Sequence, residues 1–375
     1  MGTFIGRSKN IQNVIALLEA THKAGRVGLL WGPPGIGKTA LVRALAAKHN
    51  LPLYILIPST MDPTDVNGLP ALKEIVLPNG EKATITENTL QYWSEALLRD
   101  GKGILFFDEA STAVPATQAA LLSVLQGRLV GRHTLSDEIW MVAAANNADD
   151  AADGWELAPP MANRFFHIEY TMDNNDFLEG MTVGWNKDNI TGRELDERAK
   201  IVSFLQSYPT LISKMPKNSA EAGKAWPSPR TWDALADTLP YLDDKSSRSL
   251  AIKGAVGDAA AQQFLEFERS LDLPSYDEVM GAPEKLDWKK RSSSEVYVIL
   301  SMILGRMTPE NIEKSAAVFS AAAEVGEKTD VCTALAYPLM DKVRLNAPSR
   351  EKAAIILGTV LKKYAGYLKD AKLRP

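Results

Sequence analysis

The stretch "GPPGIGKT", residues 32–39, decides the fold of this chain. It follows the apolar run "VGLLW" and leads into "KTALVRALAAKHN", so the sequence predicts a strand, a tight loop and a helix in that order. The spacing of its glycines and of Lys38 and Thr39 fits the G-x-x-x-x-G-K-[ST] pattern of a phosphate-binding loop. Glycines let backbone N–H groups point at phosphate oxygens, and the positive end of the following helix favours the same anion.

This loop supplies most of the predicted nucleotide site. Lys38 would reach the β and γ phosphates, and the Thr39 hydroxyl would coordinate Mg²⁺. We therefore expect ATP or ADP, together with Mg²⁺, as cofactors. The residues expected to contact the nucleotide from this loop are Pro34, Gly35, Ile36, Gly37, Lys38, Thr39 and Ala40.

A second apolar run, "GILFF", ends in the acidic pair Asp108 and Glu109. In an open parallel sheet, ligands bind at the carboxyl ends of the strands, where this pair would meet the phosphate loop. We expect Asp108 to hold the Mg²⁺ shell and Glu109 to orient or deprotonate the water that attacks the γ-phosphate. The alternative is a solvated acidic pair that caps the helix after it.

Strands and helices alternate from about residue 3 to residue 170, which predicts an α/β fold with a parallel sheet and helices on both faces. The predicted strands are "VGLLW", "LPLYILI", "GILFF", "IWMVAAA" and "FFHIEY". The rest of the chain reads as helices separated by one segment rich in proline, serine and charge. The predicted domains are an α/β nucleotide-binding core at 1–172, a helical region at 173–271, a linker or irregular segment at 272–293 and a helical extension at 294–375.

In that extension, "SEVYVILSMILGRM" is expected to be a core helix rather than a membrane anchor, because charged residues end it too early. The run "TPENIEKSAAVFSAAAEV" predicts a helix with Thr308 as its N-cap and Pro309 at its first position.

Composition limits the possible partners and compartment. A net charge of -4 gives no general attraction to nucleic acid or to an anionic membrane. Cys332 is the only cysteine, so the chain alone forms neither a disulfide nor a cysteine metal cluster. The start of the sequence lacks the pattern of a signal peptide, and we expect a cytoplasmic protein that does not enter a membrane.

Several motifs, in the right order over about residues 3–235, resemble the AAA+ ATPases and within them the MoxR-like group with the CbbQ and NorQ type proteins. They are "FIGR", "MDPTDVNGLPAL" and "FDEASTAVPATQAALLSVLQGRLV". The resemblance implies that Ile5 and Gly6 lie against adenine, and that "LKEIVLPNGEKATI" is an inserted β-hairpin with its turn at "PNGE". It also implies that the helical region at 173–271 is the small lid.

The same resemblance implies roles for three polar residues. Asn146 takes the sensor 1 position and would hold the lytic water, with Asn147 as an adjacent candidate and an ordinary Asn-Asn turn as the alternative. Arg164 takes the arginine-finger position and would serve the neighbouring subunit, unless it is a surface arginine paired with a carboxylate such as Glu169. Arg230 takes the sensor 2 position, where the alternative is a structural salt bridge.

For Arg230, local sequence supports a helix start, with Ser228 as N-cap and Pro229 as the first helical residue. Its guanidinium would then reach the γ-phosphate of its own subunit.

The resemblance implies a Mg²⁺-dependent ATPase that forms a homo-hexameric ring and remodels a partner protein, and it suggests a partner with a von Willebrand factor A domain. Two alternatives remain open. One is an AAA+ motor or loader that acts on nucleic acid, and the other is a slow nucleotide-gated scaffold.

Overall fold

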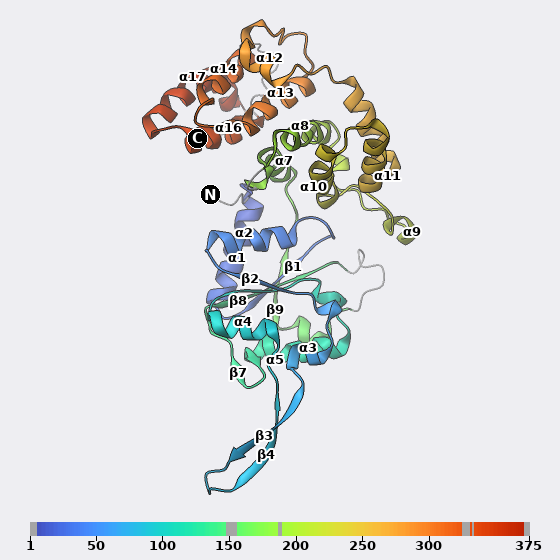
Figure 1. Cartoon of the computed structure of the whole chain (residues 1–375), viewed down its shortest axis with the longest axis vertical. Coiled ribbons are helices and arrows are strands. Elements are labelled where there is room, and N and C mark those ends of the chain that lie inside the picture. Colours follow the sequence, from blue (N-terminus) through green and yellow to red (C-terminus); the bar gives the residue numbers. More distant parts are fainter. Residues whose placement is uncertain (1–5, 148–155, 187–189, 325–330, 332–333, 371–375) are drawn as a thin grey trace. The chain divides into compact units, whose positions relative to one another are not determined.

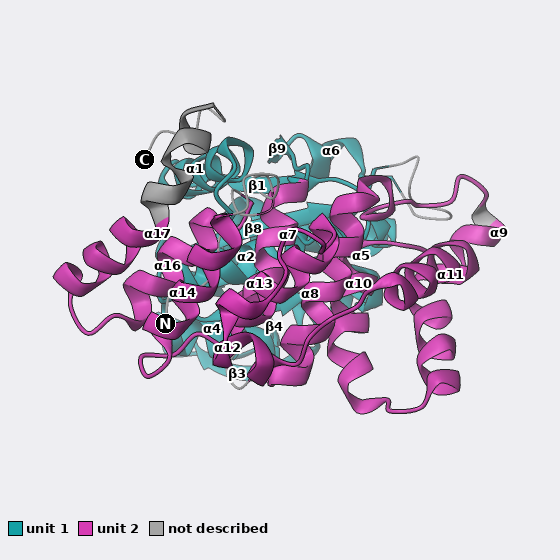
Figure 2. Ribbon diagram, turned by 90° about the horizontal axis from the view of Figure 1, so that it is seen from above, with its two compact units in different colours: residues 1–173 teal, residues 174–375 magenta. Residues whose placement is uncertain are grey.

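The computed structural model describes residues 6–147, 156–186, 190–324, 331 and 334–370. The chain divides into two compact units, unit 1 at 1–173 and unit 2 at 174–375, which Figure 2 colours separately. Each unit is described here by itself.

Unit 1 contains a five-stranded parallel sheet with the strand order β2-β5-β8-β1-β9. The strands are β1 (Val27–Trp31), β2 (Leu53–Leu56), β5 (Gly103–Phe107), β8 (Ile139–Ala145) and β9 (Phe165–Glu169). Each corresponds to a predicted apolar run, and β5 and β8 are buried along their whole length. β8 lies between β1, which leads into the phosphate loop, and β5, which leads into the acidic pair. The predicted α/β fold is confirmed.

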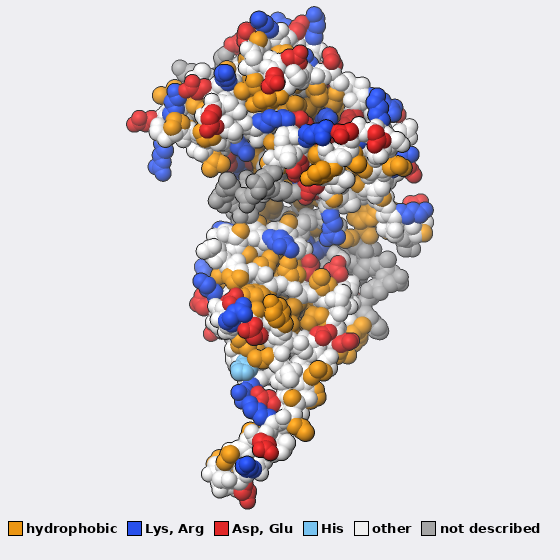
Figure 3. Space-filling view, in the orientation of Figure 1, with side chains coloured by type: hydrophobic (Ala, Val, Ile, Leu, Met, Phe, Trp, Pro, Cys, Tyr) orange, Lys and Arg blue, Asp and Glu red, His pale blue; other side chains and the backbone are white. Residues whose placement is uncertain are grey.

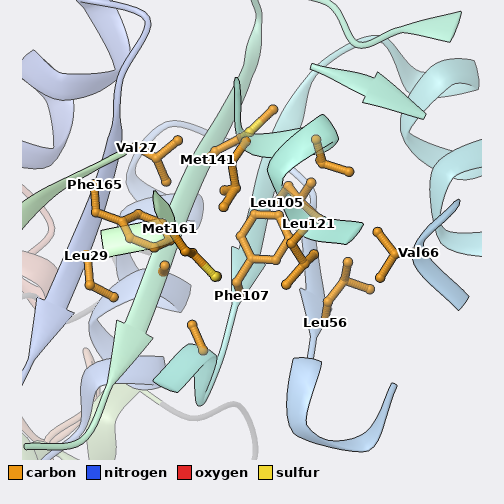
Figure 4. Close-up of a cluster of buried hydrophobic side chains, with 14 of the residues drawn as sticks. Val27, Leu29, Leu56, Val66, Leu105, Phe107, Leu121, Met141, Met161 and Phe165 are labelled. Atoms are coloured by element: carbon orange, nitrogen blue, oxygen red, sulfur yellow. The ribbon is translucent and has the colours of Figure 1, made fainter. Parts of the chain in front are cut away.

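Helices cover both faces of this sheet, because alternate residues of each strand point to opposite sides. Ile139, Met141 and Ala143 of β8 pack in one core with side chains of α3, α4, α5 and α6, which Figure 4 shows in part. Trp140 and Val142 pack on the other side with α1 and α2. The helices of unit 1 are α1 (Lys9–Lys23), α2 (Lys38–Lys48), α3 (Pro63–Asn67), α4 (Tyr92–Asp100), α5 (Pro115–Gly127) and α6 (Pro159–Ala162).

The predicted hairpin is present as β3 (Pro70–Val76) and β4 (Lys82–Asn88), an antiparallel pair that we call the arm. It extends away from the sheet of unit 1 (Figure 1). Its turn lies at the expected place, with Gly80 at a φ of 86°, and a second hairpin joins β6 (Leu129–Val130) to β7 (His133–Thr134). At the base of the arm, Thr89 donates its N–H to the carbonyl of Leu69 at 2.9 Å.

Unit 2 is helical. Its helices are α7 (Asn174–Val183), α8 (Gly192–Ser207), α9 (Ser219–Ala222), α10 (Pro229–Thr238), α11 (Lys245–Ser270), α12 (Tyr276–Gly281), α13 (Ser293–Gly305), α14 (Ile312–Ala323), α16 (Ala336–Asn346) and α17 (Arg350–Asp370). The segment expected to be irregular contains the short helix α12. The apolar run in α13 is buried from Glu295 to Leu304, as expected for a core helix.

Two predicted helix starts have different outcomes. Ser228 caps α10 by accepting the N–H of Thr231, with Pro229 at the first position, as predicted. The start at Thr308 is wrong, because α14 begins at Ile312 with Asn311 as its N-cap. The Asn311 side chain accepts the N–H of Thr308 at 2.8 Å and donates to the carbonyl of Arg306 at 2.8 Å, which holds residues 306–311 in a turn instead.

A buried arginine joins two helices of unit 2. Arg198 of α8 is 0% exposed and donates to Asp233 of α10 at 2.8 Å and to Asp237, one turn further on. Burial alone would lower the pKa of Arg198, but attraction to Asp233 and Asp237 raises it above its ordinary value. The charged guanidinium therefore fixes α10 against α8.

In the part of the chain that the structure describes, none of the helices combines the length and apolar character needed to cross a bilayer.

Candidate functional site

The loop after β1 turns tightly because glycines stand where side chains do not fit. Gly35 and Gly37 have φ angles of 80° and 96°, which L side chains rarely adopt. A Cβ on Gly32 would lie 2.6 Å from the carbonyl oxygen of Tyr170, so only glycine is accommodated at the start of the loop. Gly37 directly precedes α2, whose first residues are Lys38 and Thr39.

Lys38 is 8% exposed, and its ammonium group lies inside this loop. Nζ donates to the carbonyls of Gly32 at 2.6 Å and Pro33 at 2.9 Å. It also donates to Oδ1 of Asn146, at the end of β8, at 2.8 Å. A positive charge is therefore held at the carboxyl edge of the sheet, where an anionic group would meet it.

Thr39 and Asp108 come together across the same edge. The Thr39 hydroxyl donates to Oδ2 of Asp108 at 2.7 Å, and the second carboxylate oxygen accepts the N–H of Glu109 at 3.1 Å. A hydroxyl and a carboxylate at this separation are the oxygen donors that Mg²⁺ takes beside phosphate oxygens. The donor set therefore fits a magnesium ion.

Glu109 has an unusual backbone. Its φ of 57° and ψ of 40° lie in the left-handed region, and its side chain is exposed. Its carbonyl accepts the Thr112 hydroxyl at 2.8 Å, which closes the short turn after β5. A non-glycine residue in this region costs of the order of 1–3 kcal/mol and is often found where function requires it.

Of the two adjacent asparagines, the structure brings Asn146 to the loop through its bond with Lys38. Arg164 is held elsewhere, by α5 and α6. Its Nη1 donates to the carbonyl of Pro160 at 2.6 Å, while Nε and Nη2 donate to Oε1 of Gln126 at 3.1 and 2.9 Å. These partners are neutral, and the expected alternative partner Glu169 is not among the hydrogen-bond partners of Arg164 in the described part of unit 1.

Residues 28–170 match the family model described as "ATPase family associated with various cellular activities (AAA)". This chain therefore contains an AAA-family ATPase domain. The AAA domain binds ATP or ADP and hydrolyses ATP, and the phosphate loop and the Asp108–Glu109 pair both lie inside the matched range.

The search of curated proteins found no match to this sequence. Among solved structures, NtrX from Brucella abortus is similar with 15% identity and a TM-score of 0.40, over 90% of this chain and 69% of that one. The RuvB Holliday junction branch migration motor of Thermotoga maritima has 16% identity and a TM-score of 0.35, over 75% of this chain and 76% of that one.

The remaining predicted site residues lie at varied places. Gly6, ahead of the AAA domain, is buried and its carbonyl accepts Nε2 of Gln12 at 2.7 Å, whereas Ile5 lies outside the described residues. Ile36 of the loop is buried, and Ala40 in the first turn of α2 is exposed. Arg230 is exposed in the first turn of α10 in unit 2.

Two polar residues of the AAA domain were not singled out as site residues from the sequence. Gln118 of α5 is 1% exposed and bonds to the segment before α6, and His167 of β9 bonds to the end of α6. Gln118 stands inside the family-like "PATQAALL" stretch, which was a usable signal. No sequence signal distinguished His167, which lies among apolar residues in a predicted strand.

Proposed function

We propose that this chain is a MoxR-type AAA+ ATPase that assembles into a homo-hexameric ring, binds Mg²⁺ with ATP, and uses hydrolysis to remodel a partner protein. The observation that carries the ring is the position of Arg164, which is held by α5 and α6 and not by the phosphate loop of its own domain.

The contacts at the carboxyl edge of the sheet support a separate role for each polar residue there. Lys38 would bind the β and γ phosphates, and Thr39 and Asp108 would hold the metal. Bound Mg²⁺ would neutralise charge on the phosphate oxygens. Glu109 would orient the attacking water and accept its proton, and Asn146, fixed by Lys38, would position that water from the other side.

Arg164 would complete the site of a neighbouring subunit. A guanidinium directed at the transferring phosphoryl group contributes about 10³- to 10⁵-fold in rate in related chemistry. Arg164 is half-buried, and its hydrogen bonds go to the neutral acceptors Gln126 and Pro160, so among the described residues no carboxylate lies within hydrogen-bond range of its charge. This supports a trans-acting role.

Arg230 would direct its positive charge at the γ-phosphate bound by its own subunit.

The arm supports engagement of a protein client. Leu72 and Val76 of β3 lie on one face of the arm and are 80% and 69% exposed. Their cross-strand neighbours in β4 are Thr86 and Lys82. Figure 3 shows hydrophobic side chains on the arm, interspersed with charged ones. An isolated two-stranded hairpin is only marginally stable in water, and exposed apolar groups of this kind mark contact surfaces. We propose that the client, a protein with a von Willebrand factor A domain, covers this face.

Charge on the arm gives less support to a nucleic-acid motor. Lys73 pairs with Glu87 at 2.8 Å, and Arg132 of the neighbouring hairpin pairs with the same carboxylate at 2.9 Å. Cations paired in this way are poorly placed to bind phosphates. A motor acting on nucleic acid would show DNA-stimulated ATPase activity with a steep salt dependence.

The deciding experiment is ATPase activity per subunit against protein concentration, for wild type, Arg164→Ala and the control Arg193→Ala, with nucleotide binding measured in each. Arg193 is an exposed arginine of unit 2 paired with Asp243. We expect wild type and the control to gain activity cooperatively with concentration, while Arg164→Ala binds ATP but stays inactive. Flat activity per subunit that survives the loss of Arg164 would instead indicate a self-contained nucleotide switch.

A further inference from the structure

The short helix α6, two residues before Arg164, is held at both ends by polar side chains from other elements. Gln118 of α5 binds the segment that enters α6, and His167 of β9 binds the residue at which α6 ends. Each side chain also contacts a segment next to the nucleotide site of the same subunit. We refer to these two residues as the α6 clamp.

Gln118 uses both ends of its amide. Its Oε1 accepts the N–H of Ala158, the N-cap of α6, at 2.8 Å. Its Nε2 donates to the carbonyl of Glu156 at 3.1 Å and to the carbonyl of Ala113 at 2.9 Å. Ala113 ends the short turn that begins at Glu109. The amide therefore joins the turn carrying Glu109 to the segment leading to Arg164.

His167 joins the other strand of the site to the same helix. Trp31, the last residue of β1 before the phosphate loop, donates its indole N–H to Nδ1 of His167 at 2.7 Å. Nε2 of His167 lies 2.9 Å from the carbonyl oxygen of Ala162, the last residue of α6. The two rings also stack, with centroids 5.9 Å apart and planes at 11°.

These partners fix the tautomer of the imidazole. An indole nitrogen only donates, so Nδ1 of His167 must accept, and a carbonyl only accepts, so Nε2 must carry the proton. The neutral ring therefore makes both bonds at once. The ring therefore connects Trp31, next to the phosphate loop, to Ala162, two residues before Arg164.

We propose that Gln118 and His167 are positioning residues that set the direction of Arg164 according to the state of the nucleotide site in their own subunit. The inference rests on the proposed trans role of Arg164 and goes beyond it, since it names the link between one subunit's site and the finger it offers to the next. A displacement of about 1 Å in a catalytic group lowers rates by about 100-fold.

The test uses mixed rings of two variants. Arg164→Ala subunits keep a competent site but offer no finger, and Glu109→Gln subunits offer a finger but have no competent site. Each alone is expected to be inactive, and the mixture to regain activity at interfaces where Glu109→Gln meets Arg164→Ala. His167→Phe is then added to one partner or the other, with nucleotide binding and assembly checked for every subunit.

We expect His167→Phe in the Glu109→Gln partner to lower the regained activity about 10- to 100-fold, because only the finger of that subunit is used. The same change in the Arg164→Ala partner, which has no finger to position, should leave the regained activity within about twofold of the parent mixture. This asymmetry separates positioning from a general loss of structure. His133→Phe in the Glu109→Gln partner is the matched control and should match the unmodified mixture.

Two milder changes keep the test independent of folding. Trp31→Phe removes the donor to His167 and keeps an aromatic ring, and Gln118→Met removes the amide without placing a charge at this buried position. Each change should lower the regained ATPase activity when it is placed in the finger-donating subunit. Trp31→Phe combined with His167→Phe should lower that activity no further than either change alone.

Equal losses from both sides of the mixture, or no loss from the donating side, would overturn the inference while leaving the trans finger intact. A parent mixture that regains nothing would overturn both.

Discussion

Nζ of Lys38 donates a hydrogen bond of 2.8 Å to Oδ1 of Asn146, although 108 residues separate the two in sequence. The contact exists because β8 is inserted between β1 and β5, so that the end of β8 lies beside the loop that follows β1. The polar side chain after β8 is thereby placed beside Lys38, on the strand that lies between the one leading into the loop and the one leading into the acidic pair.

This arrangement distinguishes the two asparagines. Asn146→Ala is expected to lower kcat by about 100-fold with a small change in KM, because it removes a group that would act on the water and not on the bound nucleotide. Asn147→Ala is the matched control and should stay within about threefold of wild type. Steady-state ATPase kinetics of both variants measure this, and the reverse order would assign the sensor role to Asn147.

Lys38→Ala should abolish tight ATP binding, because it removes the buried charge that the loop holds at the sheet edge. Titration with a fluorescent ATP analogue gives the Kd. Lys48→Ala, at the far end of α2, removes an exposed lysine and should bind as wild type does. Retained tight binding in Lys38→Ala would contradict the phosphate-loop assignment.

Glu109→Gln keeps the size of the side chain and removes its basicity, so we expect ATP to bind normally and turnover to fall by at least about 100-fold. Single-turnover measurements with radiolabelled ATP would detect the trapped nucleotide. Glu95→Gln, an exposed residue of α4 paired with Arg99, is the control. Normal turnover in Glu109→Gln would exclude this carboxylate as the water activator.

Arg198→Met should destabilise unit 2 by about 2 kcal/mol, because it removes a buried cation while its carboxylate partners remain. The estimate is below the range for fully buried pairs, since Asp233 and Asp237 are 32% and 42% exposed. Arg193→Met, which breaks an exposed pair, should change stability by less than about 0.5 kcal/mol. Chemical denaturation followed by circular dichroism compares the two, and equal effects would argue against α10 being fixed through Arg198.

Leu72→Ser with Val76→Ser should leave basal ATPase activity within about twofold of wild type, because both side chains are exposed and neither belongs to a core cluster of the described part of unit 1. The same variant should lose stimulation by a von Willebrand factor A domain protein of the same organism. Lys73→Ser changes the opposite face of the arm and serves as the control. Undiminished stimulation in the double variant would move the client site away from this face.

The core of the fold could be predicted from the sequence because its signals are local. Uniformly apolar runs such as β5 and β8 are bounded by glycine or polar residues, and the phosphate loop has a fixed spacing around Lys38. The arm was predicted from its turn at Gly80 and from family resemblance. Each of these features depends on residues close together in the chain.

The connections between distant elements could not be predicted in the same way. Trp31 and His167 are 136 residues apart, and their bond depends on β9 pairing with β1, which no local pattern specifies. The start at Thr308 was wrong for a related reason. Asn311 competes for the same backbone groups, and the local sequence does not decide which side chain succeeds.

Because Glu109 has a left-handed backbone, the residue that would be most stable at this position differs from the residue that the proposed turnover requires. Glycine at this site would relieve backbone strain of about 1 kcal/mol or more and would be favoured by any selection for thermal resistance alone. Under the proposed role, that exchange would also remove the group that activates water. A programme that engineers this enzyme for heat tolerance should therefore keep Glu109 fixed and score its variants by turnover as well as by melting temperature.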